Sequence, residues 1–112
     1  MSAAYQNLYL EQGTSYSVTI TLDDVYGNNY DLNTYTAYSQ LKSSYYSANA
    51  TAAFATSLNP TTGTIVLSMD SATSSNIPPG RYVYDTIIRN TSNTTVRVLE
   101  GIVDVSPAVT IL

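Results

Sequence analysis

Residues that could carry out catalysis are few in this chain. It contains no histidine and no cysteine, which removes the usual proton-transfer group, the commonest metal ligand and the thiol nucleophile. Asp23 and Asp24 are the closest pair of carboxylates, but adjacent side chains in a turn diverge, unlike the facing pair of a glycosidase. Lys42, the only lysine, falls at the expected end of a strand, where a charge typically protects a sheet edge. We therefore expect no catalytic residues and no enzymatic activity.

Between residues 23 and 31 lies the one segment whose side chains are rich enough in oxygen to suggest a metal site. Its candidate ligands are Asp23, Asp24, Asn28, Asn29 and Asp31. Calcium takes roughly six to eight oxygen ligands, but the spacing here departs from the alternating acidic pattern of calcium loops. The same residue types also stabilise turns through their own backbone. We expect a turn, with calcium as the alternative, and neither a metal nor a cofactor.

Tyrosine is the most unusual feature of the composition, with 11 residues. Three of them alternate with polar residues and are expected in the core or on a sheet face: Tyr16, Tyr82 and Tyr84. Either Tyr82 or Tyr84 could donate its hydroxyl to the preceding backbone, as in the tyrosine corner of immunoglobulin-like sandwiches. Four others fall in polar, turn-like segments and form the candidate interaction surface: Tyr26, Tyr30, Tyr45 and Tyr46. Exposed tyrosines can anchor a protein interface or stack on sugars, and ordinary loop tyrosines are the third interpretation.

The charge pattern limits the partners. Four basic residues stand against eight acidic ones, for a net charge of −4. Four scattered cations cannot neutralise a run of phosphates, so we expect no nucleic acid. No apolar run is long enough for a membrane span, and the N-terminus lacks the pattern of a signal peptide. We expect synthesis in a cytoplasm and no membrane partner.

Alternation of apolar and polar residues with a period of two dominates the chain and predicts short strands. The predicted strands are 5–10, 15–22, 35–42, 51–58, 64–69, 81–89 and 96–105. Asn59–Gly63 is expected to form a hairpin loop, and residues 70–80 to hold one helical turn capped by Asp70 or Ser71. Gly101, in the middle of the last strand, predicts a bulge or a close backbone approach. We expect one all-β domain over residues 1–112, with an ordered core of about 5–106, built as an antiparallel β-sandwich of seven to eight strands.

Two segments carry a resemblance to a known family: Gly80-Arg81-Tyr82-Val83-Tyr84-Asp85, and Leu99-Glu100-Gly101-Ile102-Val103-Asp104-Val105-Ser106-Pro107. Taken with the order of the other segments, they resemble small immunoglobulin-like domains in virion proteins of tailed bacteriophages, including those that infect cyanobacteria. The resemblance runs from about Tyr5 to Thr110. The chain departs from the family at Leu32–Tyr35 and at Lys42, where the family often has Leu-Thr-Gly-Tyr and Arg.

What the resemblance implies is a non-enzymatic structural protein of the phage virion with an immunoglobulin-like β-sandwich. Since the chain starts at Met1 and ends soon after the predicted sandwich, we expect the domain to stand alone. A many-copy surface protein needs only one domain with adhesive faces, which favours an accessory capsid decoration or cement protein that binds capsid subunits. A structural or adhesin-like subunit of the tail, neck or baseplate is the alternative role in the virion. If the protein is not a phage protein, the alternative is a stand-alone carbohydrate-binding module. Self-association as a homo-oligomer stays open.

Overall fold

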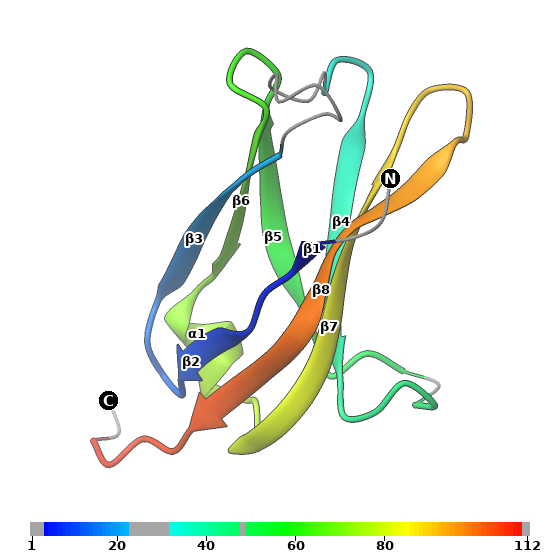
Figure 1. Ribbon diagram of the computed structural model, residues 1–112. Helices are drawn as coiled ribbons and strands as arrows, with labels where there is room; N and C mark the ends of the chain where they lie inside the picture. The colour runs from blue at the N-terminus through cyan, green and yellow to red at the C-terminus, as the bar shows by residue number, and fades with distance from the viewer. Residues whose placement is uncertain (1–3, 23–31, 48, 111–112) are drawn as a thin grey trace.

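The computed structural model describes residues 4–22, 32–47 and 49–110, which form eight strands and one short helix (Figure 1). The strands are β1 (Ala4–Tyr5), β2 (Leu8–Glu11), β3 (Tyr16–Thr21), β4 (Thr36–Lys42), β5 (Ala52–Asn59), β6 (Thr64–Met69), β7 (Gly80–Arg89) and β8 (Thr95–Ser106), and the helix is α1 (Ser71–Ser75). The strands predicted from alternation lie within one or two residues of these, except at the N-terminus. No helix in the described residues is long and apolar enough to cross a membrane.

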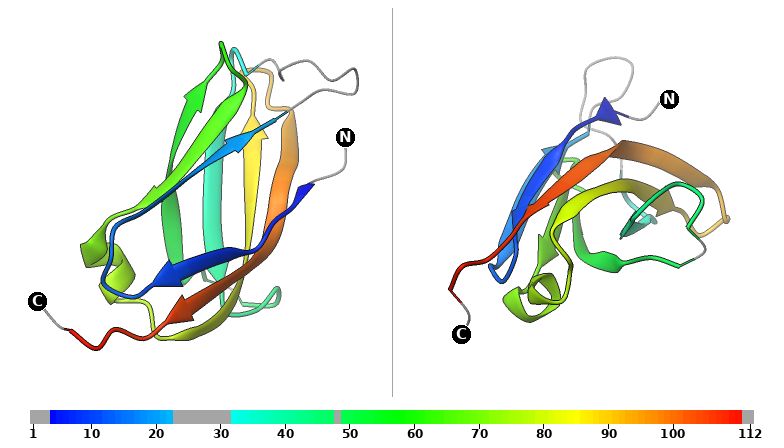
Figure 2. Two further views of the ribbon diagram at one scale, coloured as in Figure 1. Left: turned by 60° about the vertical axis from the view of Figure 1, so that its left-hand side comes forward. Right: turned by 90° about the horizontal axis from the view of Figure 1, so that it is seen from below.

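The strands form two sheets that share one strand. In the first sheet β4 and β8 pair with β7 in antiparallel fashion, and β1 and β2 lie beside β8. In the second sheet β6 lies between β3 and β5. Views from two further directions show the two sheets facing each other around the interior (Figure 2). Antiparallel hairpins at β4–β5, β5–β6 and β7–β8, with α1 as the single short helix of the described chain, confirm the predicted all-β sandwich.

β5 passes from the first sheet into the second. Its start pairs with β4, up to Phe54 opposite Ser39. From Ala55 onward it pairs with β6, where Ala55 lies opposite Ser68. The Phe54 ring points into the interior, 6.2 Å between centroids from Tyr16 of β3 and 6.2 Å from Tyr84 of β7. Phe54 therefore joins both sheets at the point where the strand changes partner.

The core consists of the inward half of each alternating strand, as the period of two requires. Its most deeply buried aliphatic side chains come from both sheets: Leu10, Leu32, Leu41, Ile65, Leu67, Ile77, Ile88, Val98 and Val103. Tyr82 and Tyr84 are also buried, and Tyr16 is half-buried against the cluster. These positions confirm the prediction that the strand tyrosines belong to the core. No buried side-chain nitrogen or oxygen in the described residues is without a hydrogen-bond partner.

At the N-terminus the single predicted strand over residues 5–10 is wrong. The segment is broken into β1 and β2, and both run parallel to β8. The break at Gln6 and Asn7 is accommodated by substitute hydrogen bonds: the Gln6 N–H donates to the Glu100 carbonyl at 2.9 Å, and the Ile102 N–H donates to the Asn7 Oδ1 at 3.3 Å. A Cβ on Gly101 would lie 2.1 Å from the Gln6 carbonyl oxygen. Gly101 therefore marks a close backbone approach, which is one of its two predicted roles. The bulge in β8 lies elsewhere, at the register shift between Arg97 and Leu99.

Entry into β7 is fixed by two polar contacts that the sequence predicted. Asp70 caps α1 by accepting a hydrogen bond from the Thr73 N–H at 2.7 Å. The Tyr82 hydroxyl donates to the Pro78 carbonyl at 2.5 Å, four residues upstream. This contact has the form of the tyrosine corner and shows Tyr82, rather than Tyr84, to be its residue. Together the two contacts set where β7 begins and hence which of its side chains face outward.

Candidate binding surface

All four basic residues of the chain lie on the outer face of one sheet. We call the outward side chains of β4, β7 and β8 the charged face. Its members are Thr36, Tyr38, Gln40, Lys42, Arg81, Val83, Asp85, Ile87, Arg89, Thr95, Arg97, Glu100, Ile102 and Asp104. Because these strands are neighbours in space, residues from distant parts of the sequence form one surface.

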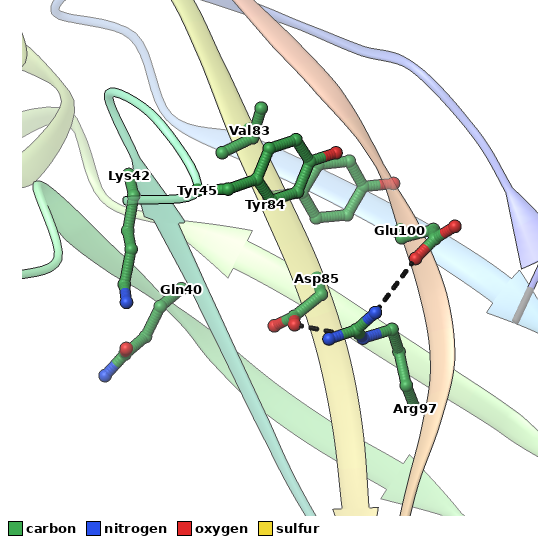
Figure 3. A pocket seen from close by; sticks show the side chains of 8 residues that line it. All are labelled: Gln40, Lys42, Tyr45, Val83, Tyr84, Asp85, Arg97 and Glu100. Atoms are coloured by element: carbon green, nitrogen blue, oxygen red, sulfur yellow. Dashed lines mark hydrogen bonds and ion pairs between the residues drawn. The ribbon is translucent and has the colours of Figure 1, made fainter. Parts of the chain in front are cut away.

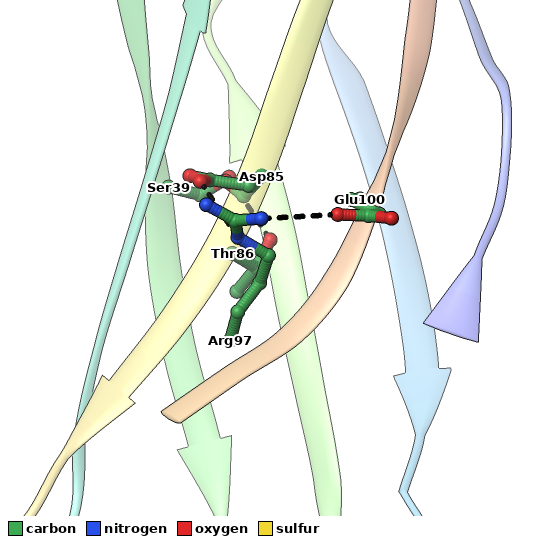
Figure 4. Close-up of polar contacts among 5 residues, drawn as sticks. All are labelled: Ser39, Asp85, Thr86, Arg97 and Glu100. Atoms are coloured by element: carbon green, nitrogen blue, oxygen red, sulfur yellow. Dashed lines mark hydrogen bonds and ion pairs between the residues drawn. The ribbon is translucent and has the colours of Figure 1, made fainter. Parts of the chain in front are cut away.

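Three ion pairs organise the charged face (Figure 4 shows two of them). Arg97 reaches Asp85 on β7 at 3.2 Å through its Nε and Glu100 on its own strand at 3.3 Å. Arg81 reaches Asp104 at 3.0 Å. The contact between Asp85 and Arg97 crosses from β7 to β8. Because all of these side chains are substantially exposed, each pair contributes at most about 1 kcal/mol to stability.

Beneath Asp85 the backbone is held by two buried hydroxyl groups. The Ser39 Oγ donates to the Asp85 carbonyl at 2.8 Å, and the Thr86 Oγ1 donates to the Ser39 Oγ at 3.1 Å. Both side chains are fully enclosed between the sheets. The backbone that carries Asp85 is thus joined to β4 on its inner side by a side-chain hydrogen bond.

A shallow pocket of about 230 Å³ opens on the charged face (Figure 3). It is lined by Gln40, Lys42, Tyr45, Val83, Tyr84, Asp85, Arg97 and Glu100. Tyr45 comes from the β4–β5 connection, where the Ser47 N–H donates to the Ser44 carbonyl at 3.2 Å. Tyr45 and Val83 form an apolar end of the pocket, and the ion pairs of Arg97 form a polar end (Figure 3). Such a site offers a ring to pack against and both donors and acceptors to a ligand.

Of the four tyrosines in the predicted interaction surface, two can be placed. Tyr45 is 72% exposed and lines the pocket, whereas Tyr46 is 97% exposed and is not among the residues that line it. Tyr26 and Tyr30 lie outside the described residues. The structure therefore brings Tyr45, but not Tyr46, together with the charged face.

Three further exposed tyrosines lie on or beside the same sheet and were missed by sequence reasoning. Tyr38 belongs to the charged face, and Tyr5 and Tyr9 lie next to it on β1 and β2. For two of them, the alternation of inward and outward residues along the strand could have predicted the exposure. Tyr9 stands between the buried Leu8 and Leu10, and Tyr38 stands between Ala37 and Ser39. An aromatic residue between two inward residues must point to solvent.

The outer face of the second sheet has the opposite character. We call the outward side chains of β3, β6 and the paired part of β5 the hydroxyl face: Ser17, Thr19, Thr21, Ala55, Ser57, Asn59, Thr64, Val66 and Ser68. None of them is charged. In the described residues the first sheet thus has a charged and aromatic outer face, and the second sheet has an uncharged one.

No three acidic side chains in residues 4–22, 32–47 and 49–110 gather closely enough to hold a metal ion. The predicted choice between a turn and a calcium site concerns residues 23–31, which lie outside that part of the chain.

Burial raises the pKa of the Tyr84 hydroxyl well above its ordinary value, with smaller contributions from Tyr16 and Tyr5, and burial also raises the pKa of Tyr16. Both hydroxyls therefore ionise at lower pH in the unfolded chain, near the ordinary pKa of 10.0. We expect the free energy of unfolding to be unaffected by these groups well below pH 10 and to fall as the pH rises above 10. Urea titrations at increasing alkaline pH measure this slope. The Tyr84→Phe variant should show a shallower decline, and an equal decline in both proteins would contradict the assignment.

Comparisons with known proteins bear on the fold. No protein-family model matches the sequence, and no curated protein matches it either. Among solved structures, the filamin domain of Lin-41 aligns with a TM-score of 0.50 and 14% identity, over 88% of this chain and 82% of that chain. An internalin-like protein of Listeria monocytogenes aligns with a TM-score of 0.52 and 16% identity. The alignment covers 93% of this chain and 28% of that chain. At such identities the likeness concerns the fold alone, and with the strand topology it shows that the chain is an immunoglobulin-like β-sandwich.

Proposed function

We propose that this domain is a non-enzymatic protein-binding module of a tailed-phage virion, which attaches to other virion subunits through its charged face. The observation that carries the proposal is the gathering of all four basic residues and of Tyr38 and Tyr45 on one side of the sandwich. Tyrosine and arginine are the residues most enriched among those that dominate protein interfaces. The link to phage virions comes from the sequence resemblance.

Within the virion we propose the role of an accessory capsid decoration or cement protein, in preference to a tail, neck or baseplate subunit. A decoration protein acts through many weak, repeated contacts, for which one small domain with a broad polar face is sufficient. Quantitative mass spectrometry of purified particles separates the two roles. We expect a copy number comparable to that of the major capsid protein, whereas tens of copies or fewer would indicate the tail, and absence from particles would overturn both.

Arg97 is the residue of the charged face whose replacement should separate binding from stability. The Arg97→Gln variant loses the contacts to Asp85 and Glu100. Because these are exposed, we expect the free energy of unfolding to change by less than about 1 kcal/mol. Binding to particles that lack the protein should weaken about tenfold, which corresponds to about 1.4 kcal/mol. Thr64→Gln, on the hydroxyl face, is the matched control and should bind normally, while undiminished binding by the Arg97 variant would count against the charged face.

Carbohydrate binding is the second candidate function, favoured by the pocket at Tyr45. A ring beside amide, carboxylate and guanidinium groups supplies both the stacking surface and the hydrogen bonds that a sugar needs. On a glycan array, the Tyr45→Ala variant should lose any binding that the unmodified domain shows. Tyr46→Ala should retain it, because Tyr46 is exposed and does not line this pocket. Equal loss in both variants would place the sugar elsewhere, and no binding by the unmodified domain would exclude this candidate.

A further inference from the structure

β3 is an edge strand whose outer side is free in the described residues. It pairs with β6 on one side, and no strand or backbone hydrogen bond of the described chain meets it on the other (Figure 1). Protein sheets usually protect such edges with a charge, a proline, a bulge or a very short strand. β3 has six residues, no charge and no proline, and its register with β6 is continuous.

The ladder shows which backbone groups face the open side. The Leu22 N–H donates to the Gly63 carbonyl at 2.8 Å, and Leu22 follows directly on the pair Thr21–Thr64. In an antiparallel ladder the residues that bond to the partner alternate. The even-numbered residues Tyr16, Val18 and Ile20 therefore bond to β6. It follows that the N–H and carbonyl groups of Ser17, Thr19 and Thr21 point away from β6.

The other edge of the sandwich is protected. β1 has two residues and β2 has four, the chain breaks between them at Gln6 and Asn7, and the side chain of Glu11 brings a charge to the end of β2. These are the features by which sheets avoid edge-to-edge pairing. Of the two edges that the described residues form, β3 is thus the one with the length and neutrality to accept another strand.

From these observations we propose that the domain forms a symmetric dimer in which β3 pairs antiparallel with β3 of a second copy. A twofold axis at Thr19 places Thr19 opposite its equivalent and Ser17 opposite Thr21, so that about six backbone hydrogen bonds form. The edge is uncharged in both copies, so the ladder brings no like charges together although each copy carries a net charge of −4.

The inner side of the edge favours the same partner. Tyr16 and Val18 pack against the core but remain partly exposed, because no strand lies beyond β3 in the described residues. A second β3 would place its own Ile20 beside Val18 and its own Leu22 beside Tyr16, and would extend the core across the axis. The pairing therefore buries apolar side chains as well as joining backbone groups. It leaves the charged face of each copy open.

Amide hydrogen exchange on the unmodified protein tests the proposal directly. At near-millimolar concentration we expect the Ser17, Thr19 and Thr21 amides to exchange at least about tenfold more slowly than in dilute solution. The Val18 and Ile20 amides should be protected at both concentrations, because they bond to β6. Sedimentation equilibrium should show a dimer over the same range. A monomer throughout, or a dimer whose Ser17, Thr19 and Thr21 amides stay fast, would overturn the proposal.

Two substitutions at Thr19 test the interface by separate means. Thr19→Pro removes an outward N–H that is not used in the ladder to β6, and Thr19→Lys places two like charges opposite each other at the axis. Both should sediment as folded monomers, and the lysine variant should regain part of its association at high salt. Ser57→Lys is the control, since Ser57 lies two strands from the edge, opposite Val66, and it should remain dimeric. Folded variants at Thr19 that dimerise like the unmodified protein would refute the proposed pairing.

Discussion

Replacing Gly101 by alanine is expected to destabilise the domain by about 3 kcal/mol and to detach the N-terminal strands from β8. An added Cβ would lie 2.1 Å from the carbonyl oxygen and 2.8 Å from the carbonyl carbon of Gln6. Because both are backbone atoms, no side-chain rotation relieves the clash. The segment at Gln6 must then move away, with loss of its bond to Glu100 and of the 2.6 Å hydrogen bond that the Tyr84 hydroxyl donates to it.

Urea unfolding measures the loss, and amide exchange along β2 locates it. Asp104→Ala is the control on the same strand: its side chain is partly exposed and forms an ion pair with Arg81, so the cost should stay below about 1 kcal/mol. A Gly101→Ala variant as stable as the unmodified protein, with β2 still protected from exchange, would show that the close approach does not hold the N-terminus.

The Phe54→Ala variant is expected to lose about 4 kcal/mol, the largest effect of any single truncation that we predict. Phe54 is 5% exposed, contacts an aromatic ring from each sheet, and stands where β5 changes its partner. The cavity would therefore open between the sheets rather than within one of them. Since small domains have about 5–15 kcal/mol of stability in total, the variant should be close to unfolding at physiological temperature.

Phe54→Leu separates the loss of the ring from the loss of volume. It keeps most of the apolar volume and should cost less than about 1.5 kcal/mol. Thermal and urea unfolding of the two variants under identical conditions give the comparison. A loss below about 1 kcal/mol for Phe54→Ala would mean that the two sheets do not depend on this contact.

Most of the fold could be predicted because alternation reports directly which side of a strand faces the core. The period alone assigns Tyr16, Val18 and Ile20 on β3 to the inner face, and the turn at Asn59–Gly63 and the cap at Asp70 follow from local backbone chemistry. Alternation does not say which strand lies beside which. β5 keeps its period through Phe54 and Thr56 while its partner changes from β4 to β6, so nothing in the sequence marks the crossing.

The same limit applies to the candidate surface. Tyr45 was predicted to be exposed from its polar surroundings, but its place beside Arg97 depends on the pairing of β4 with β7 and of β7 with β8. The parallel pairing of β1 and β2 with β8 could not be predicted from the sequence either, because it joins strands from the two ends of the chain. Only the contact of Asp85 with Arg97 could be anticipated, because neighbouring strands in sequence are commonly neighbours in space.

Lys42 provides the most direct test of the claim that the charged face binds other virion subunits. It is the only lysine in the chain and lies on that face, so labelling of its side-chain amine, resolved by peptide mapping from that of the α-amino terminus, reports on the face. The Ser57→Lys variant adds a matched amine on the hydroxyl face. Labelling of both positions is compared by mass spectrometry in the isolated protein and in intact particles. We predict that Lys42 is labelled in the isolated protein and protected in particles, whereas the lysine at position 57 is labelled in both. Equal labelling of Lys42 in both states would contradict the account.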